Sequence, residues 1–205
     1  TNGSTMPSLR PICLALALMA PPGAAGAADK DGGFAPKGVG LDSCKVVVEV
    51  AEKSRNDLSL LVSWLDGYLT AVNTFIANVY DVAPWQEPGT VLSLVLQHCS
   101  QNPDDRIANV APKLVEFMAP TRLEARSTTV DAKAGDKTVQ IYTAVLKRAQ
   151  EALIKQGFLS GGADGAFGPK TRTAFERFQE KSGITKTGLP DQETLFRLFL
   201  PRQPS

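Results

Sequence analysis

Apolar residues recur every three or four positions over two separate stretches of the chain, which predicts helices in both. In the first stretch, residues 42–118, polar or proline-containing breaks divide the pattern into four helices. The second helix is the longest, and its apolar stripe is wide enough for a central, mostly buried helix. Because glycine inside a helix costs about 1 kcal/mol relative to alanine, we expect another helix to pack closely at Gly67. The stripe consists of Leu61, Trp64, Leu65, Tyr68, Leu69, Val72, Phe75, Ile76 and Val79.

Three shorter helices are predicted in the second stretch, residues 142–205. Asp164 and Gly165 form a turn before the middle helix, because aspartate can bond the backbone just ahead and glycine accepts a positive φ. Pro169 suits the first helical position, where its missing N–H would have no partner anyway. Asp191 can cap the third helix. The core positions of the three helices are Val145, Leu146, Ala149 and Leu153, then Thr171, Ala174, Phe175 and Phe178, then Leu195, Leu198 and Phe199.

Residues 121–141 contain few apolar residues, and neither a helical nor a strand period persists through them. We therefore interpret this segment as a linker between two all-α domains, residues 28–120 and residues 142–205. Within the second domain, residues 148–151 (Arg-Ala-Gln-Glu) are similar to residues 177–180 (Arg-Phe-Gln-Glu). Two equivalent helices around a small pseudo-symmetric core would explain this similarity.

The two predicted domains carry opposite charge within a chain of 205 residues and net charge +1. Residues 28–120 hold 7 Lys and Arg against 12 Asp and Glu, a net −5, whereas residues 142–205 hold 10 against 6, a net +4. The domains could attract one another, or the basic domain could bind an anionic polymer, or both could be solvated surfaces without a partner. A nucleic-acid partner is not expected, because it would call for a strongly basic face.

The N-terminal residues follow the order of a secretory signal peptide. Arg10 follows Met6, an apolar run covers residues 12–20, and small residues at 25–27 supply a cleavage site. The apolar run is shorter than the roughly 20 residues that a membrane span needs. We therefore expect residues 1–27, including Cys13, to be removed, and a mature chain without a membrane span to reach the periplasm.

Cys44 and Cys99 are the only cysteines that would remain after this cleavage. An oxidising compartment favours a disulfide between them. Closing a loop of this length should contribute on the order of 3–5 kcal/mol to stability. A metal site is not expected, because His98 is the only histidine. We interpret His98 as a partly buried structural residue, with a pH-dependent role as the alternative.

Residues 142–200 resemble the small three-helix peptidoglycan-binding domain that accompanies cell-wall enzymes. The resemblance implies three helices and a shallow groove for peptidoglycan near the glycine-rich loop and the second helix. It is carried by many positions at the right spacing. These are Gln150, Leu153, Gly157, Phe158, Asp164, Gly165, Phe167, Gly168, Pro169, Thr171, Phe178, Gln179, Gly183, Ile184, Thr187, Gly188, Asp191, Thr194 and Leu195.

Peptidoglycan offers sugar hydroxyls, peptide amides and carboxylates to such a domain. Hydroxyls and amides suit hydrogen bonds with aspartate, threonine and glutamine, whereas arginine matches a carboxylate with two parallel bonds. Glycine lets the backbone approach a ligand closely. Phe167, like most matching positions, also has an ordinary structural role in so small a core. The candidate ligand-binding residues are Asp164, Gly165, Phe167, Thr171, Arg172 and Gln179.

A smaller set of positions relates the first stretch to a known group of proteins. Residues 42–117 resemble the HdeA-like group of small periplasmic helical proteins, to which acid-stress chaperones belong. The resemblance implies a helical architecture. The chaperone activity itself depends on acid-triggered opening, which no motif encodes. The matching positions are Cys44, Trp64, Gly67, Tyr68, Asp81, Cys99, Asn102 and Pro103.

The sequence shows no catalytic set, since it lacks a His-rich zinc signature, a free Cys/His pair and a Gly-x-Ser-x-Gly motif. We therefore expect a non-enzymatic protein without a cofactor that binds peptidoglycan, while residues 42–118 contact a protein partner. One alternative is an HdeA-like stress chaperone held at the wall. Others are an accessory subunit of a cell-wall hydrolase and a cell-wall enzyme of unfamiliar sequence.

Several aromatic and apolar residues carry further expectations. Trp64 and Tyr68 share the apolar stripe and are expected to pack in the core. Trp85 lies in a loop between prolines and is the candidate for an exposed stacking residue. Phe196 and Leu200 turn away from the three-helix core. We expect them to pack against the first domain or a second chain, because burying such a side chain contributes about 1.5–3 kcal/mol.

Overall fold

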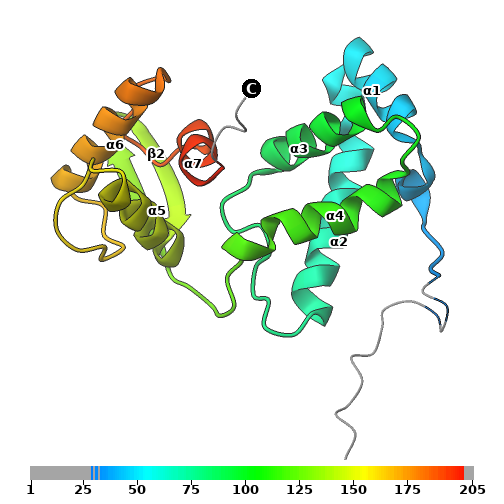
Figure 1. Cartoon of the computed structure of the whole chain (residues 1–205), viewed down its shortest axis with the longest axis horizontal. Helices are drawn as coiled ribbons and strands as arrows, with labels where there is room; N and C mark the ends of the chain where they lie inside the picture. The colour runs from blue at the N-terminus through cyan, green and yellow to red at the C-terminus, as the bar shows by residue number, and fades with distance from the viewer. Residues whose placement is uncertain (1–28, 30, 32, 201–205) are drawn as a thin grey trace, which may run out of the picture. The chain divides into compact units, whose positions relative to one another are not determined.

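The computed structural model describes residues 29, 31 and 33–200 (Figure 1). The predicted signal peptide, residues 1–27, lies outside these described residues. From Pro36 onward the described residues belong to one compact unit. Its 3-10 helices (η), α-helices and strands are, in order, η1 (Gly38–Leu41), α1 (Cys44–Lys53), η2 (Arg55–Leu58), α2 (Ser59–Phe75), α3 (Pro88–Gln101), α4 (Ile107–Met118), η3 (Ala119–Thr121), β1 (Thr129–Ala134), β2 (Lys137–Tyr142), α5 (Thr143–Lys155), α6 (Pro169–Ser182) and α7 (Gln192–Phe199).

Helices α1 to α4 enclose one hydrophobic core, and the predicted helical class is confirmed. Ser43 begins α1 by accepting a hydrogen bond from the backbone N–H of Val46 at 3.4 Å. A disulfide joins Cys44 at the start of α1 to Cys99 in the last turns of α3, which confirms the predicted pair. The buried core residues are Cys44, Val47, Leu58, Leu61, Leu65, Leu69, Val82, Val91, Leu92, Val95, Cys99, Ile107, Val110, Leu114 and Met118.

Helix α2 is buried along one face only, so the prediction of a mostly buried central helix was wrong. Leu61, Leu65 and Leu69 form its buried face. By contrast, Phe75 is 80% exposed. The predicted close approach at Gly67 is also missing, since a Cβ atom built there would meet no described atom within 4 Å. The apolar stripe is therefore wider than the surface that the other described helices cover.

The segment predicted as a linker contains a β-hairpin, so the expectation that no strand forms there was wrong. Strands β1 and β2 pair antiparallel, with Ala134 opposite Lys137. Gly135 takes the first position of the two-residue turn with φ +62°, where hairpin turns of type II′ favour glycine. Ala132 and Ile141 are buried. The alternation of apolar and polar residues is short and interrupted by alanines, which hides it among the polar residues around it.

Helices α5, α6 and α7 surround a second hydrophobic core, with β2 next to α5 (Figure 1). Gly183 ends α6 with φ +66°, the left-handed conformation that commonly follows a helix. Asp191 caps α7 as predicted, because its Oδ1 accepts the backbone N–H of Thr194 at 2.9 Å. The buried members of this core are Trp85, Leu123, Ile141, Val145, Leu146, Ala149, Leu153, Ala174, Phe175, Phe178, Leu195 and Leu198.

Trp85, from the loop before α3, belongs to this second core. It is 5% exposed, and its ring centroid lies 5.5 Å from that of Phe199 in α7. The prediction of an exposed stacking residue was therefore wrong, because α7 supplies the aromatic cover. Phe196 and Leu200, which were expected to pack against the first domain or a second chain, are half-buried against this second core. The ring contact with Trp85 is made by Phe199 instead.

Polar contacts join the same two regions. The side-chain amide of Gln192, at the start of α7, donates to the backbone oxygen of Trp85 at 2.5 Å. Its oxygen accepts the backbone N–H of Glu87 at 3.0 Å and the hydroxyl of Thr90 at 2.8 Å. One glutamine side chain thus connects the first turn of α7 to the first turn of α3.

Candidate functional site

Gln150 organises the glycine-rich loop before α6. It lies on α5, is 1% exposed, and its Oε1 accepts the backbone N–H of Gly165 at 2.7 Å. Its Nε2 lies 2.9 Å from Oδ1 of Asp164, 3.0 Å from the backbone oxygen of Ala166 and 3.1 Å from Oγ1 of Thr171. A buried amide whose donors and acceptor are all used holds a loop in one conformation, because breaking it would leave buried polar groups unpaired.

Gly165 is required at the centre of this loop for two physical reasons. Its φ is +73°, a left-handed backbone conformation that residues other than glycine adopt only at an energetic cost. A Cβ atom at this position would also lie 2.7 Å from Cγ2 and 2.8 Å from the backbone oxygen of Thr143. The loop backbone therefore lies directly against the start of α5.

Asp164 presents its carboxylate to solvent beside this glycine. The backbone N–H of Ala166 and the amide of Gln150 donate to its Oδ1, and these two hydrogen bonds, in that order, lower the pKa of the carboxyl. Both of these hydrogen bonds end on Oδ1. The site thus offers an exposed anionic acceptor that is held in place by hydrogen bonds.

Gln179 makes the corresponding contacts one helix later. It lies on α6 and is fully buried, and its Oε1 accepts the backbone N–H of Gly188 at 2.8 Å. Its Nε2 lies 2.9 Å from Oγ1 of Thr187, 3.0 Å from the backbone oxygen of Leu189 and 2.8 Å from Oγ1 of Thr194. The similarity of residues 148–151 and 177–180 therefore corresponds to two equivalent loop clamps.

The structure divides the six predicted site residues into exposed and buried ones. Gln179 and Thr171 are buried, and their polar atoms are hydrogen-bonded within the domain. Gly165 is also buried and contributes through its backbone. Phe167 is half-buried, its ring centroid 6.4 Å from that of Phe175 in the core. Arg172 is exposed and paired with Glu176 at 3.0 Å, and Asp164 is exposed as described.

Sequence reasoning missed Gln150 as a residue of this site. It was one of the positions that matched the domain pattern, but it lies 14 residues before Asp164, on a different helix. The available signal was its equivalence to Gln179 in the two similar segments. Glutamine at a position that faces the core would have needed buried partners, which the loop supplies.

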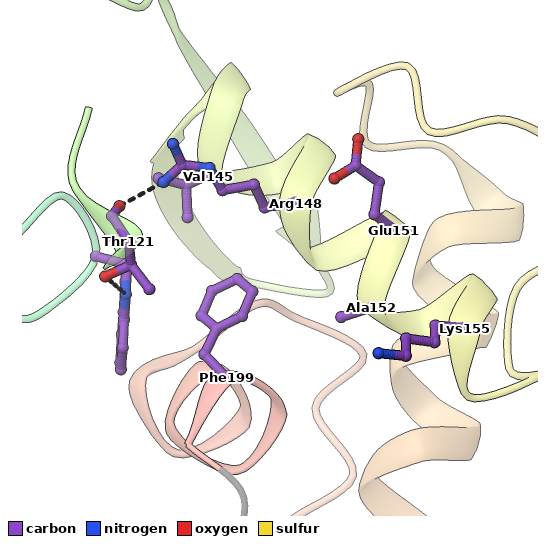
Figure 2. Close-up of a pocket in the computed structure, with 8 residues that line it drawn as sticks. Thr121, Val145, Arg148, Glu151, Ala152, Lys155 and Phe199 are labelled. Atoms are coloured by element: carbon purple, nitrogen blue, oxygen red, sulfur yellow. Dashed lines mark hydrogen bonds between the residues drawn. The ribbon is translucent and has the colours of Figure 1, made fainter. Parts of the chain in front are cut away.

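A pocket of about 300 Å³ lies beside α5 and α7, and Figure 2 shows its lining. Trp85, Val145, Ala152 and Phe199 form the apolar part of this lining. Arg148 crosses its edge and donates to the backbone oxygen of Thr121. None of the six predicted site residues lines the pocket, so it is separate from the loop that Gln150 holds.

Comparison with known families agrees with this geometry in the C-terminal region. Residues 144–198 match the model of the family described as "Putative peptidoglycan binding domain". The predicted resemblance is thereby confirmed for this region, and the helices α5 to α7 form a peptidoglycan-binding type of domain. No curated protein and no solved structure matches the chain. The HdeA-like resemblance of residues 42–117 stays a prediction.

No helix in residues 33–200 combines the length and the apolar character that crossing a bilayer requires. The same part of the chain holds no cluster of three or more His, Cys, Asp or Glu residues arranged for a metal ion.

Proposed function

We propose that this chain is an exported, non-catalytic protein of the periplasm that attaches to peptidoglycan through helices α5 to α7. The observation that carries the proposal is the family match over residues 144–198. Export is supported by the signal-peptide pattern of residues 1–27. The disulfide between Cys44 and Cys99 fits an oxidising compartment. The N-terminal helices then present a surface to a protein partner at the wall.

The binding surface that we propose combines the exposed part of the 160–168 loop with the start of α6. Asp164 would accept a hydrogen bond from a sugar hydroxyl or a peptide amide through its exposed carboxylate. Arg172 would pair with a peptide carboxylate, because its guanidinium can exchange the solvent-exposed ion pair with Glu176 at little cost. The half-buried ring of Phe167 would lie under the ligand beside them.

The other three predicted residues would act on this surface indirectly. Gly165 allows the left-handed turn, and Thr171 and Gln150 fix it from below. Gln179 holds the second glycine turn, at Gly188. Arg172 lies next to this turn, since a Cβ atom built at Gly188 would be 3.0 Å from Cγ of Arg172. These residues therefore position the ligand contacts without touching the ligand.

Sedimentation of the mature chain with purified sacculi tests the proposal. The unaltered protein should sediment, and Arg172→Gln should sediment less. Lys181→Gln is the matched control, because it removes the same charge from another exposed position of α6. Raising the salt concentration should weaken binding, since exposed charges are screened beyond about 8–10 Å at ordinary ionic strength. Absence of sedimentation of the unaltered protein would refute the proposal, and release of soluble wall fragments would show an enzyme instead.

A further inference from the structure

The pocket beside α5 and α7 has an apolar wall that no charged group interrupts. Val145 and Ala152 of α5 form this wall together with the rings of Trp85 and Phe199, whose centroids lie 5.5 Å apart. The volume of the pocket is about 300 Å³. An apolar cavity of about 150 Å³ already accepts a benzene molecule. The pocket therefore has room for an apolar group larger than a single ring.

The face of α5 that lines this pocket also carries two cations. Val145, Arg148, Ala152 and Lys155 recur three and four positions apart, so they share one face of the helix. Arg148 and Lys155 are two helical turns apart, which is about 10 Å along the axis. Ala152 lies between them. A ligand against the apolar wall would therefore have a positive charge near each end.

Only one of these two cations is already engaged. The guanidinium of Arg148 donates to the backbone oxygens of Thr121 and Arg122, the second at 2.9 Å. Within residues 33–200, neither Arg148 nor Lys155 forms an ion pair with an acidic side chain. Lys155 is exposed, and Figure 2 shows its ammonium turned toward Phe199. Lys155 is therefore the cation that can contact a ligand.

The charge around the pocket favours an anion. Glu151 is the acidic residue of the lining, and in Figure 2 its carboxylate is turned away from Phe199. Two cations against one acid leave the lining with a net charge of +1. This is the sign of residues 142–205 as a whole, which carry +4. A ligand that combines an apolar body with one negative charge would match both the wall and its edge.

We propose that this pocket binds a small apolar carboxylic acid, with the apolar part against Trp85 and Phe199 and the carboxylate at Lys155. Small-molecule sites typically join apolar walls to a few placed polar groups, and they begin at about 300 Å³. The proposal does not rest on the proposed function, because Asp164, Phe167 and Arg172 lie outside the pocket. The ligand would contact Trp85 as well as α5 and α7, and so would stabilise the contact between the N-terminal helices and the C-terminal domain.

Titration of the mature chain with octanoate tests the site, followed by NMR of the tryptophan indole N–H groups. The chain has two tryptophans. The signal of Trp85 should shift, because its ring lines the pocket. The signal of Trp64 should stay, because its Nε1 donates to the backbone oxygen of Lys37 at 2.9 Å and Trp64 is not part of the lining. Trp64→Phe assigns the two signals.

Two further probes test the chemical class of the ligand. Octanol has the same chain without the charge and should bind more weakly than octanoate. Adsorption on apolar surface alone would favour the alcohol, because a carboxylate loses more hydration on burial. Each CH₂ group that enters the pocket should strengthen binding by up to about fourfold. Hexanoate should therefore bind several-fold more weakly than octanoate.

Three variants test the residues. Lys155→Gln should weaken octanoate binding by about two- to fivefold, the range for an exposed ion pair, and leave octanol binding unchanged. Lys147→Gln is the matched control, because it removes the same charge from an exposed position of α5 that does not line the pocket. The control should bind octanoate normally. Ala152→Leu should fill the pocket and abolish the shift of the Trp85 signal.

Several outcomes would overturn the proposal. One is a Trp85 signal that stays unchanged at every octanoate concentration, or that still shifts in a folded Ala152→Leu variant. Another is octanol binding as tightly as octanoate. Equal losses with Lys155→Gln and Lys147→Gln would show attraction to the basic domain as a whole, without a site at Lys155. If Ala152→Leu fails to fold, the comparison of these two lysine variants decides.

Discussion

Gln150 and Gln179 occupy equivalent positions and make the same set of contacts in two successive parts of the C-terminal domain. Each accepts the backbone N–H of a glycine with positive φ through Oε1, Gly165 with φ +73° and Gly188 with φ +68°. Each brings its Nε2 to the hydroxyl of a threonine in the first turn of the next helix, Thr171 or Thr194. A helix, a clamped glycine turn and the start of the next helix therefore form a unit that occurs twice.

The two glutamine clamps should make the domain strongly sensitive to loss of either amide. We expect Gln150→Ala and Gln179→Ala each to lower the free energy of unfolding by at least about 2 kcal/mol, because each buried polar group left unpaired costs about 1–3 kcal/mol. Gln156→Ala is the control, since Gln156 is an exposed glutamine at the end of α5. Urea unfolding measures all three. Equal stability of the clamp variants and the control would contradict the structural role.

The two clamped glycines should differ in how far they tolerate alanine. A Cβ atom at Gly165 meets a backbone oxygen at 2.8 Å, whereas at Gly188 it meets flexible side chains at 3.0 Å. Both substitutions also force a left-handed conformation, which costs about 1–2 kcal/mol. We therefore expect Gly165→Ala to destabilise more than Gly188→Ala. Gly162→Ala is the control, because nothing lies within 4 Å of its Cβ position. The opposite order in thermal unfolding would show that the loop at Gly165 can move.

The C-terminal domain could be predicted from the sequence in more detail than the rest of the fold. Pro169, Asp191 and Gly183 act on the backbone locally, so a helix start, a cap and a helix end follow from residue type. The roles of Thr171 and Gln179 could not be assigned in this way. The same polar side chain can reach a ligand or a buried loop, and only the tertiary packing shows which partner it has.

The β-hairpin and Trp85 were also predicted wrongly from the sequence, because their structure too depends on tertiary packing. The hairpin at Gly135 has a recognisable turn, but its short alternation becomes a signal only where α5 covers Ile141. Trp85 is buried because Phe199, more than a hundred positions later, lies against it. Contacts at that sequence distance leave no periodic pattern, whereas helices do.

Asp105 should make the N-terminal helices sensitive to acid. Its Oδ2 lies 2.8 Å from Nζ of Lys113 in α4 and 2.8 Å from Nε2 of His98 in α3. Hydrogen bonds from Lys113 first, and then from His98, lower the pKa of the carboxyl. A lowered pKa means that its contribution is fully present above the ordinary aspartate value of about 3.9 and is lost as the pH falls through the folded-state value.

Asp105→Asn should accordingly lower the melting temperature at neutral pH and flatten its decline at acid pH. Asp104→Asn removes the neighbouring, exposed carboxylate and serves as the control. Thermal unfolding followed over a series of pH values compares the three proteins. If Asp105→Asn and the unaltered chain lose stability in parallel on acidification, another group is responsible for the acid sensitivity.

The Cys44–Cys99 disulfide should contribute substantially to the stability of the N-terminal helices. It joins positions 55 residues apart, and a loop of this length predicts a contribution of about 3–5 kcal/mol. The double variant Cys44→Ala with Cys99→Ala should therefore unfold at a much lower urea concentration. Mass spectrometry after alkylation of the native protein should find neither of these thiols modified. Two alkylated thiols at these positions would contradict the bond.

The last prediction concerns Gln192, whose side chain joins the first turn of α7 to the first turn of α3. Because its Oε1 accepts the backbone N–H of Glu87, the exchange of that single amide hydrogen reports on the contact. Gln192→Ala should speed exchange at Glu87. It should leave Val91 unchanged, since that amide donates to the backbone oxygen of Glu87 within the start of α3. Glu193→Ala, a change at the next and exposed position of α7, should alter neither amide. Loss of three hydrogen bonds at about 0.5–1.5 kcal/mol each is enough to be measured. If exchange at Glu87 is the same in all three proteins, Gln192 does not hold the C-terminal domain to the N-terminal helices in solution. The contact between Trp85 and Phe199 and the hydrogen bond from Arg148 to the backbone oxygen of Thr121 would then have to hold them.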